Sequence, residues 1–256
     1  MTHEGKVIIV TGASSGIGAG IAERLGNDGA QIALADIDVT GAGAVAGRIG
    51  DRARVVDCDV TSEESLQAAV DDTIKTFGRL DGIINNAGVL QISSALETSV
   101  EDWDRMFAIN VRGMFLGTKV VAAALIEQGE GGSIVNAASG AGRHGVGYLS
   151  HYCATKASAI SMTQSFALEL ADHNIRVNGY APGHIMTPMW DNIWGPYGEK
   201  VGKTEDEIRE LFLGTIPLGR WGDPADVAAG VSWLLTDDAG YITGQTLPIN
   251  GGEWLH

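Results

Sequence analysis

Apolar residues along the chain follow two alternating patterns. Short runs of β-branched and other apolar residues predict strands, and longer segments with apolar residues every three or four positions predict helices. The runs predict strands at Val7–Val10, Gln31–Ala35, Arg54–Val56, Leu80–Ile84, Ser133–Ala137, Ile175–Tyr180 and Thr246–Ile249. The periodic segments predict helices at Gly16–Asn27, Gly41–Ile49, Thr61–Phe77, Val100–Glu127, Ser150–Ala171, Glu205–Leu213 and Asp223–Leu235.

This alternation predicts an α/β fold with a parallel sheet and helices on both faces. The strands are mostly continuous apolar runs, which is typical of strands buried on both sides. In such sheets ligands bind at the carboxyl ends of the strands. Thr61 with Glu64 predicts a capping box, and Pro224 suits the first turn of a helix. The segment Trp190–Lys203, rich in aromatic residues and glycine, fits neither pattern and is expected to be irregular.

Charge and cysteine content narrow the partners and the compartment. The chain of 256 residues has 17 Lys and Arg against 32 Asp and Glu, a formal net charge of −15. Such a surface repels phosphate backbones, which argues against a nucleic acid partner. Cys58 and Cys153 are too few for a disulfide framework, which favours a reducing compartment. No signal peptide, membrane-length apolar run or metal-ligand spacing is recognised, so we expect a soluble, cytoplasmic protein without a metal.

A glycine-rich turn follows the first predicted strand. It reads Thr11-Gly12-Ala13-Ser14-Ser15-Gly16-Ile17-Gly18, with the glycines spaced G-x-x-x-G-x-G. Glycines let the backbone approach a pyrophosphate, and the helix that begins here turns its free N–H groups toward the phosphates. A plain tight turn does not need three glycines, so we predict a dinucleotide site.

Asp36 ends the second predicted strand, 18 residues after Gly18. A carboxylate at this place accepts hydrogen bonds from the adenosine ribose hydroxyls and repels a 2′-phosphate. No Arg or Lys lies within residues 12–18 or 36–40 to neutralise such a phosphate. The sequence therefore predicts NAD rather than NADP as the cofactor.

The candidate chemistry lies on the later elements. Tyr152 and Lys156 are four residues apart on a predicted helix and share one face, where the ammonium would lower the pKa of the phenol. Ser139 follows the fifth predicted strand, at the ligand-binding edge of the sheet. Asn110 is a polar amide among apolar residues of a long helix, which suits a functional residue or a satisfied core amide equally well.

Together these motifs closely resemble the short-chain dehydrogenase/reductase family, from Lys6 to about Gly252. The resemblance implies a single-domain Rossmann fold over residues 1–256, with a doubly wound, seven-stranded parallel sheet. It also implies that Tyr152 is the general acid/base, that Lys156 lowers its pKa and holds the nicotinamide ribose, and that Ser139 orients the substrate oxygen. Asn110 would position a water in the proton relay. The implied cofactor-binding residues are Gly12, Ser14, Ser15, Gly16, Ile17, Gly18, Asp36, Asp59, Val60, Asn86, Ala87, Gly88, Tyr152, Lys156, Pro182, Gly183, Ile185 and Thr187.

Within the family, the run Thr187–Trp190 resembles acetoin/butanediol dehydrogenases and sorbitol-type polyol dehydrogenases. That resemblance implies a small alcohol or ketone substrate, a lid at about residues 186–214 and a homotetramer. His144, His184 and Trp190 are candidate substrate contacts, although each also suits a structural role.

Three rival functions are weighed against the dehydrogenase. A 3-oxoacyl-[acyl-carrier-protein] reductase is disfavoured by Asp36 and by the acidic charge. A hydrolase is disfavoured because Ser139 lacks the G-x-S-x-G elbow. A non-enzymatic dinucleotide sensor has no need of Tyr152 and Lys156 together.

Overall fold

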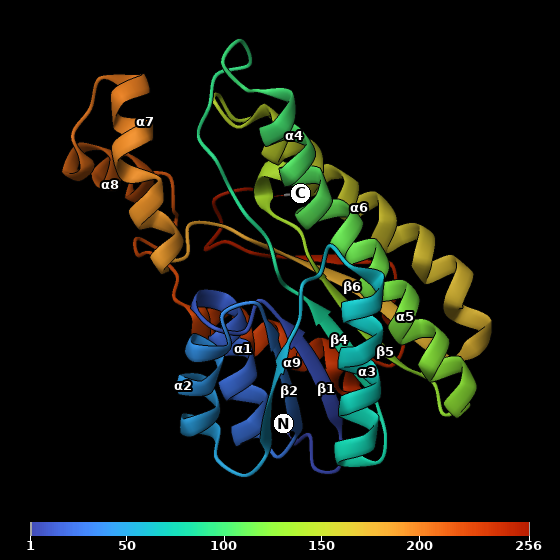
Figure 1. The fold of residues 1–256 in the computed structure, drawn as a ribbon. Coiled ribbons are helices and arrows are strands. Elements are labelled where there is room, and N and C mark those ends of the chain that lie inside the picture. Colours follow the sequence, from blue (N-terminus) through green and yellow to red (C-terminus); the bar gives the residue numbers. More distant parts are fainter. Residues whose placement is uncertain (1, 256) are drawn as a thin grey trace.

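The computed structural model describes residues 2–255, which are built around a seven-stranded parallel sheet (Figure 1). The strand order is β3-β2-β1-β4-β5-β6-β7. The strands are β1 (Val7–Thr11), β2 (Gln31–Asp36), β3 (Ala53–Asp57), β4 (Gly82–Asn85), β5 (Gly132–Ala137), β6 (Ile175–Pro182) and β7 (Thr246–Ile249). The order reverses beside β1, between β2 and β4, and a ligand crevice forms at such a switch point in open α/β sheets. The predicted fold class is confirmed.

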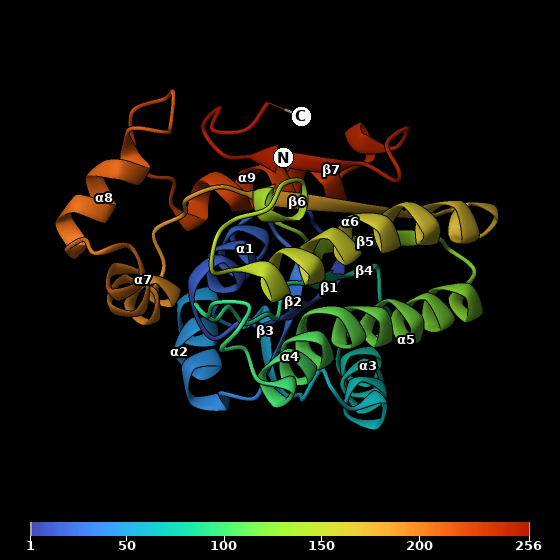
Figure 2. The same ribbon diagram turned by 90° about the horizontal axis from the view of Figure 1, so that it is seen from above.

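Helices cover both faces of this sheet (Figure 2). Successive residues of β1 point to opposite faces, so Ile8 and Val10 belong to one buried core, and Val7 and Ile9 to the other. The first core is covered by α1 (Gly16–Asn27), α2 (Val39–Ile49) and α9 (Pro224–Leu235). The second is covered by α3 (Glu63–Phe77), α5 (Gly113–Gln128) and α6 (Ser150–Leu170).

Two helix starts test the predicted capping residues. Helix α9 begins with a capping box between Asp223 and Asp226, and Pro224 lies in its first turn, as expected. Helix α3 is capped by Ser62, whose hydroxyl accepts from the backbone N–H of Ser65, so the predicted cap at Thr61 is wrong by one residue. Thr61 instead donates its hydroxyl to the Asp59 carboxylate at 2.8 Å.

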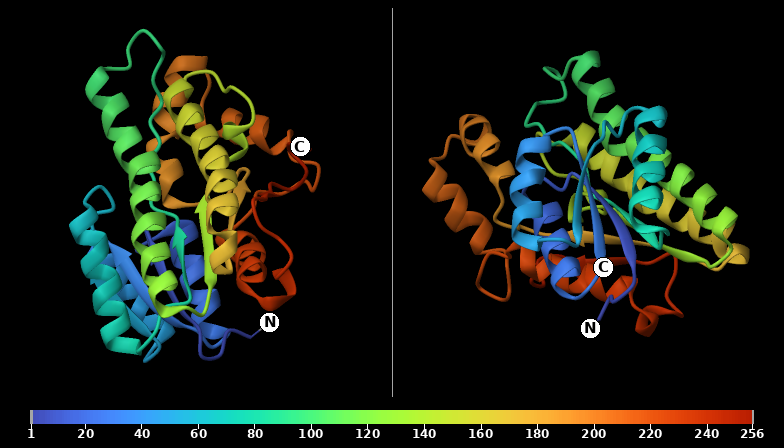
Figure 3. Two further views of the ribbon diagram at one scale, coloured as in Figure 1. Left: turned by 90° about the vertical axis from the view of Figure 1, so that its right-hand side faces the viewer. Right: turned by 60° about the horizontal axis from the view of Figure 1, so that its bottom comes forward.

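The long predicted helix is continuous but not uniform. It consists of α4 (Val100–Phe107), a π-helical turn at Ala108–Arg112 and α5, and α4 and α5 run beside α6 (Figure 3). By length and composition Val100–Gln128 could cross a membrane, so the expectation that no segment reaches this length is corrected. Its most apolar window is 56% buried inside the protein, which is typical of a core helix.

The segment after β6 is more regular than its sequence suggested. A 3-10 turn (Pro188–Asn192) leads into α7 (Trp194–Val201), and α8 (Glu205–Leu213) follows with a capping box at Thr204. These helices lie to one side of the sheet, near the carboxyl end of β6 (Figure 1). The irregular segment predicted at Trp190–Lys203 is thus mostly helical. Trp190 stacks on Trp194, and Tyr197 packs on Phe212 of α8. This packing stabilises the helix despite the low helix propensity of its glycines.

Two buried imidazoles are expected to make the stability of this fold sensitive to acid. His151 is fully buried, and neither ring nitrogen has a hydrogen-bond partner among residues 2–255. Burial lowers the pKa values of His151 and His3 below their usual range, so below about pH 6.5 the unfolded chain binds protons that the folded chain resists. We expect the free energy of unfolding to fall by on the order of 1 kcal/mol between pH 7.5 and 5.

Urea titrations at several pH values measure this slope. His151→Phe removes a titrating group and should flatten the slope, whereas His173→Asn at an exposed position should leave it unchanged. A slope that is the same in wild type and His151→Phe would show that His151 does not contribute.

Candidate active site

Two adjoining cavities of about 720 and 510 Å³ open at the carboxyl ends of the central strands. The larger extends over the glycine-rich turn, Asp36 and the end of β4. The smaller lies between β6, α7, α8 and the C-terminal segment. The residues that line both cavities are Ile17, Tyr152, Pro182, Thr187 and Met189. Tyr152 therefore stands where a ligand in one cavity meets a ligand in the other.

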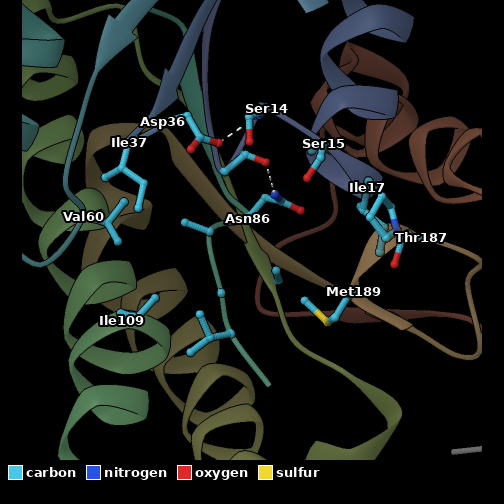
Figure 4. A pocket seen from close by; sticks show the side chains of 18 of the residues that line it. Ser14, Ser15, Ile17, Asp36, Ile37, Val60, Asn86, Ile109, Thr187 and Met189 are labelled. Atoms are coloured by element: carbon cyan, nitrogen blue, oxygen red, sulfur yellow. Dashed lines mark hydrogen bonds between the residues drawn. The ribbon is translucent and has the colours of Figure 1, made fainter. Parts of the chain in front are cut away.

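The glycine-rich turn has the shape that a pyrophosphate requires. Gly12 and Gly16 adopt φ values of +64° and +55°, which other residues rarely adopt. A side chain at Gly12 would come within 2.8 Å of the Ala87 Cα, and one at Gly18 would collide with the Gly12 carbonyl oxygen. The glycines of the turn thus present backbone to the larger cavity, next to the side chains of Ser14, Ser15 and Ile17 (Figure 4).

The start of α1 is left open on this side. No side chain caps its N-terminus, since Ser15 at the N-cap position makes no side-chain hydrogen bond there. The first-turn N–H groups of α1 and its positive dipole end therefore remain available to an anion. With the bare glycine turn, this arrangement fits a dinucleotide diphosphate.

Asp36 lies at the end of β2 beside this turn. Its carboxylate accepts the backbone N–H of Ser14 at 2.9 Å (Figure 4). It also accepts the backbone N–H of Asp38 at 2.9 Å. Ile37 is exposed and lines the same cavity. The carboxylate therefore joins the glycine turn to the far end of the cavity, where an adenosine ribose would lie.

Asn86, which follows β4, holds the glycine turn in place through its side-chain amide. Its amide nitrogen donates to the carbonyl oxygens of Thr11 and Gly12, each at 3.0 Å. Its amide oxygen accepts the hydroxyl of Tyr180 at 2.8 Å. Since Tyr180 is fully buried on β6, this chain of hydrogen bonds connects the sheet to the cofactor loop. Asn86 lines the cavity, but its amide is already engaged by the protein.

We expect Tyr180→Phe to raise the KM for NAD by about three- to tenfold with little change in kcat. The substitution removes one neutral hydrogen bond, worth roughly 1 kcal/mol, and leaves the Asn86 amide oxygen unpaired beneath the loop. Initial-rate kinetics with varied NAD measure the effect. Equal losses in kcat and in cofactor affinity would contradict a role confined to the loop.

Tyr152, Ser139 and Lys156 converge at the junction of the cavities. Lys156 is buried on α6, donates to the Ala137 carbonyl oxygen at 2.9 Å and lies 5.6 Å from the centre of the Tyr152 ring. Enclosure by protein raises the pKa of Tyr152 to about 12, which the hydrogen bond from Ser139 partly offsets. Burial lowers the pKa of Lys156 to about 8.

The sequence predicted a lowered pKa for Tyr152, and in this structure the direction is opposite. The ammonium is directed to a backbone carbonyl rather than to the phenol oxygen, and loss of water dominates for both groups.

Asn110 lies beside the site, outside both cavities. The π-helical turn brings its amide to the backbone of Val89, where it accepts the N–H and donates to the carbonyl oxygen, both at 2.8 Å. It also donates to the Thr155 hydroxyl. Of the two readings open from sequence, a satisfied buried amide describes its contacts in this structure.

The structure brings nearly all the other predicted cofactor residues to the larger cavity. Gly183 and Ile185 line the smaller one instead, in the segment that follows β6. His144, His184 and Trp190, the candidate substrate contacts, line the smaller cavity.

Other lining residues were missed from sequence. Arg105 and Ile109 of the π-turned helix line the larger cavity, and Glu253 and Trp254 line the smaller one. Their places depend on how distant segments fold back, which local patterns do not encode. A carboxylate and an indole directly after Gly251-Gly252 are the signal that could have drawn attention to the C-terminal segment.

Residues 12–253 match a family model described as enoyl-(acyl carrier protein) reductase. Sorbitol dehydrogenase of Cereibacter sphaeroides is 37% identical over 255 residues, with all of both chains covered. Diacetyl reductase [(S)-acetoin forming] of Staphylococcus epidermidis is 40% identical over 255 residues, covering 96% of this chain and 98% of that one. The 3-oxoacyl-[acyl-carrier-protein] reductase FabG of Thermotoga maritima is 36% identical, covering 98% and 99%. A crystal structure of NAD⁺-bound xylitol dehydrogenase superposes with a TM-score of 0.93 at 35% identity, covering 98% and 100%.

Proposed function

The chain belongs to the short-chain dehydrogenase/reductase family, and on this premise we propose that it interconverts a secondary alcohol and a ketone on a small polar substrate with NAD(H). The observation that carries the proposal is the place of Tyr152, in the wall shared by the two cavities. A phenol there can exchange a proton with a substrate oxygen that faces the nicotinamide end of the cofactor.

Each residue of the junction has a distinct role in this proposal. Bound NAD(H) supplies the hydride chemistry. Tyr152 accepts the alcohol proton in oxidation and donates it to the carbonyl oxygen in reduction. Ser139 hydrogen-bonds the same substrate oxygen, and Lys156 holds the nicotinamide ribose. Asn110 fixes the backbone at Val89, which lines the cofactor cavity.

The substrate class is a polyol or a vicinal diol and its ketone. Relatives named for sorbitol and diacetyl, together with the xylitol dehydrogenase structure, support this choice. So do the hydroxyl-binding groups that line the smaller cavity, which include Ser139, His184 and Thr215.

Reduction of an acyl-carrier-protein thioester is the second candidate, because the family model and one relative carry such names. A net charge of −15 disfavours docking of an acidic carrier. Absorbance of NADH at 340 nm, followed with sorbitol, xylitol, threitol, acetoin and acetoacetyl thioesters, separates the two. Turnover of the polyols or acetoin supports the proposal, and turnover of thioesters alone refutes it.

The proposal also covers the domain organisation, the oligomeric state and the compartment of the protein. The chain folds as a single domain, in which residues 186–214 close over the substrate. The protein is a cytoplasmic homotetramer that associates through α4, α5 and α6. The exposed apolar residues Phe115, Ile126 and Leu168 on these helices support the association, and light scattering of the purified protein tests it.

A further inference from the structure

The wall of the smaller cavity is largely apolar, and separate segments of the chain supply it. Leu90 and Ile92 come from the segment after β4, Val146 and Leu149 from the segment before α6, Phe212 from α8 and Trp254 from the C-terminal segment. Each of these side chains is only partly buried. A ligand group that covers such surface is stabilised by the hydrophobic effect only if the group is itself apolar.

Two hydrogen-bond donors in this wall are used within the protein. The indole N–H of Trp190 donates to the Ile185 carbonyl oxygen at 2.8 Å. The hydroxyl of Thr215 directs its proton to the Phe212 carbonyl oxygen at 2.7 Å or to the Glu253 carboxylate at 3.1 Å. Both donors are therefore engaged before a ligand arrives.

Two further polar side chains of the wall are enclosed by protein. One oxygen of Glu253 accepts from Thr215 and lies 2.8 Å from Nδ1 of His184, and the other oxygen is shielded from solvent. Both ring nitrogens of His144 are shielded from solvent in the same way. This part of the cavity therefore offers few partners to a ligand hydroxyl, although polar residues line it.

The polar groups that serve a substrate gather where the cavity adjoins the cofactor cavity. Tyr152 lines both cavities, and Ser139, which lines the smaller one, hydrogen-bonds its phenol. This pair suits one oxygen or two adjacent oxygens of a substrate. An extended polyol would place its other hydroxyls against the apolar wall, where each hydroxyl without a partner costs free energy.

We propose that the substrate is a vicinal diol, with its ketone, that carries an alkyl chain or a ring directed against this apolar wall. The inference rests on the proposed function and narrows it, because it selects the vicinal diols over the polyols. A volume of 510 Å³ lies within the range of pockets that enclose drug-sized ligands, so the cavity has room for a substituent that the smallest vicinal diol lacks.

The substituent takes no part in the chemistry. In oxidation the carbinol C–H bond breaks and its hydride passes to NAD⁺, while the hydroxyl proton passes to Tyr152 and from there to solvent. The carbon–oxygen double bond forms at that carbon, and the neighbouring hydroxyl and its substituent stay unchanged. We therefore expect the substituent to act through binding, with its effect mainly on KM.

The first test compares diols with polyols of the same carbon number: 2,3-butanediol with threitol, 2,3-pentanediol with xylitol and 2,3-hexanediol with sorbitol. With NAD, kcat/KM of the diols is expected to rise by up to about fourfold for each added CH₂, the value for burial of a methylene group. From 2,3-pentanediol upward, each diol should exceed its paired polyol by about tenfold or more, because the polyol hydroxyls lose their partners.

The second test puts polar atoms into the wall at nearly constant size. Leu90→Asn and Val146→Thr are expected to lower the ratio of kcat/KM for 2,3-hexanediol to that for 2,3-butanediol by about threefold or more. Leu96→Asn and Val39→Thr make the same changes at exposed positions that do not line the cavity, and should leave the ratio unchanged. Since the ratio compares two substrates on one protein, a loss of folded enzyme does not alter it.

The outcomes separate this inference from the proposed function. A series that does not rise with chain length, or a polyol that turns over better than its paired diol, would overturn the inference and leave the dehydrogenase assignment intact. An unchanged ratio in both cavity variants would do the same. An enzyme that oxidises none of these alcohols with NAD would refute the proposed function itself, and this inference with it.

Discussion

Tyr152→Phe is expected to lower kcat by more than about 10²-fold while the Kd for NAD changes by no more than about twofold. General acid–base catalysis by a positioned side chain contributes about 10²–10⁴-fold, and phenylalanine retains the ring but has no proton to exchange. The ring keeps its place between the two cavities, so cofactor binding should survive. Steady-state turnover and titration of NAD by fluorescence measure the two quantities.

Tyr241→Phe is the matched control, because Tyr241 is fully exposed and its hydroxyl has no role in the site. It should turn over at the wild-type rate. A Tyr152→Phe variant with more than a tenth of wild-type activity would exclude Tyr152 as the acid/base.

The pKa of Tyr152 also gives the two directions of the reaction different pH dependences. At about 12 the pKa keeps the phenol protonated through the neutral range, ready to donate in ketone reduction. Alcohol oxidation needs the phenolate form of Tyr152 to accept the alcohol proton, so its rate should rise with pH while that of reduction does not.

Much of the fold could be predicted because its central strands β1, β2, β4, β5 and β6 are mostly buried on both faces. Such strands are short apolar runs, and the helices between them restrict the connections to parallel crossovers. The π-helical turn at Ala108–Arg112 could not be predicted, since its sequence continues a helical pattern and only the contacts of Asn110 reveal it. Helix α7 was missed because its glycines lower its helix propensity, and contacts between aromatic rings stabilise it.

The candidate site, like the fold, could be predicted only in part. Tyr152 and Lys156 could be paired from sequence because a spacing of four residues puts them on one face of a helix. The direction of their pKa shifts could not be predicted from sequence, because it depends on how much water the folded chain excludes from each group. Glu253 was missed because it meets His184, nearly 70 residues earlier in the chain, only after the C-terminal segment folds back over the cavity.

Asp36→Ala is expected to reduce the ratio of kcat/KM for NAD to that for NADP by roughly 10²-fold, or about 2.7 kcal/mol. The substitution removes the acceptor for the ribose hydroxyls, each such bond to a charged group being worth about 1.5–3 kcal/mol, and it also removes repulsion of a 2′-phosphate. Of the residues that line the larger cavity, only Arg105 and Lys156 are cationic, so the gain with NADP should be smaller than the loss with NAD. Initial rates with both cofactors at one substrate concentration measure the ratio.

Asp36 also accepts the N–H groups of Ser14 and Asp38, so its removal could loosen the glycine turn without any effect on ribose recognition. Two further variants separate these causes. Asp36→Asn keeps an acceptor for the Ser14 N–H but loses the charge, and should still shift the ratio toward NADP. Asp38→Ala removes the side chain that caps α2 through the Gly41 N–H, at a cost of about 1 kcal/mol, and should lower stability while leaving the ratio unchanged. If Asp36→Asn behaves like Asp38→Ala, the carboxylate supports the loop and does not select the cofactor.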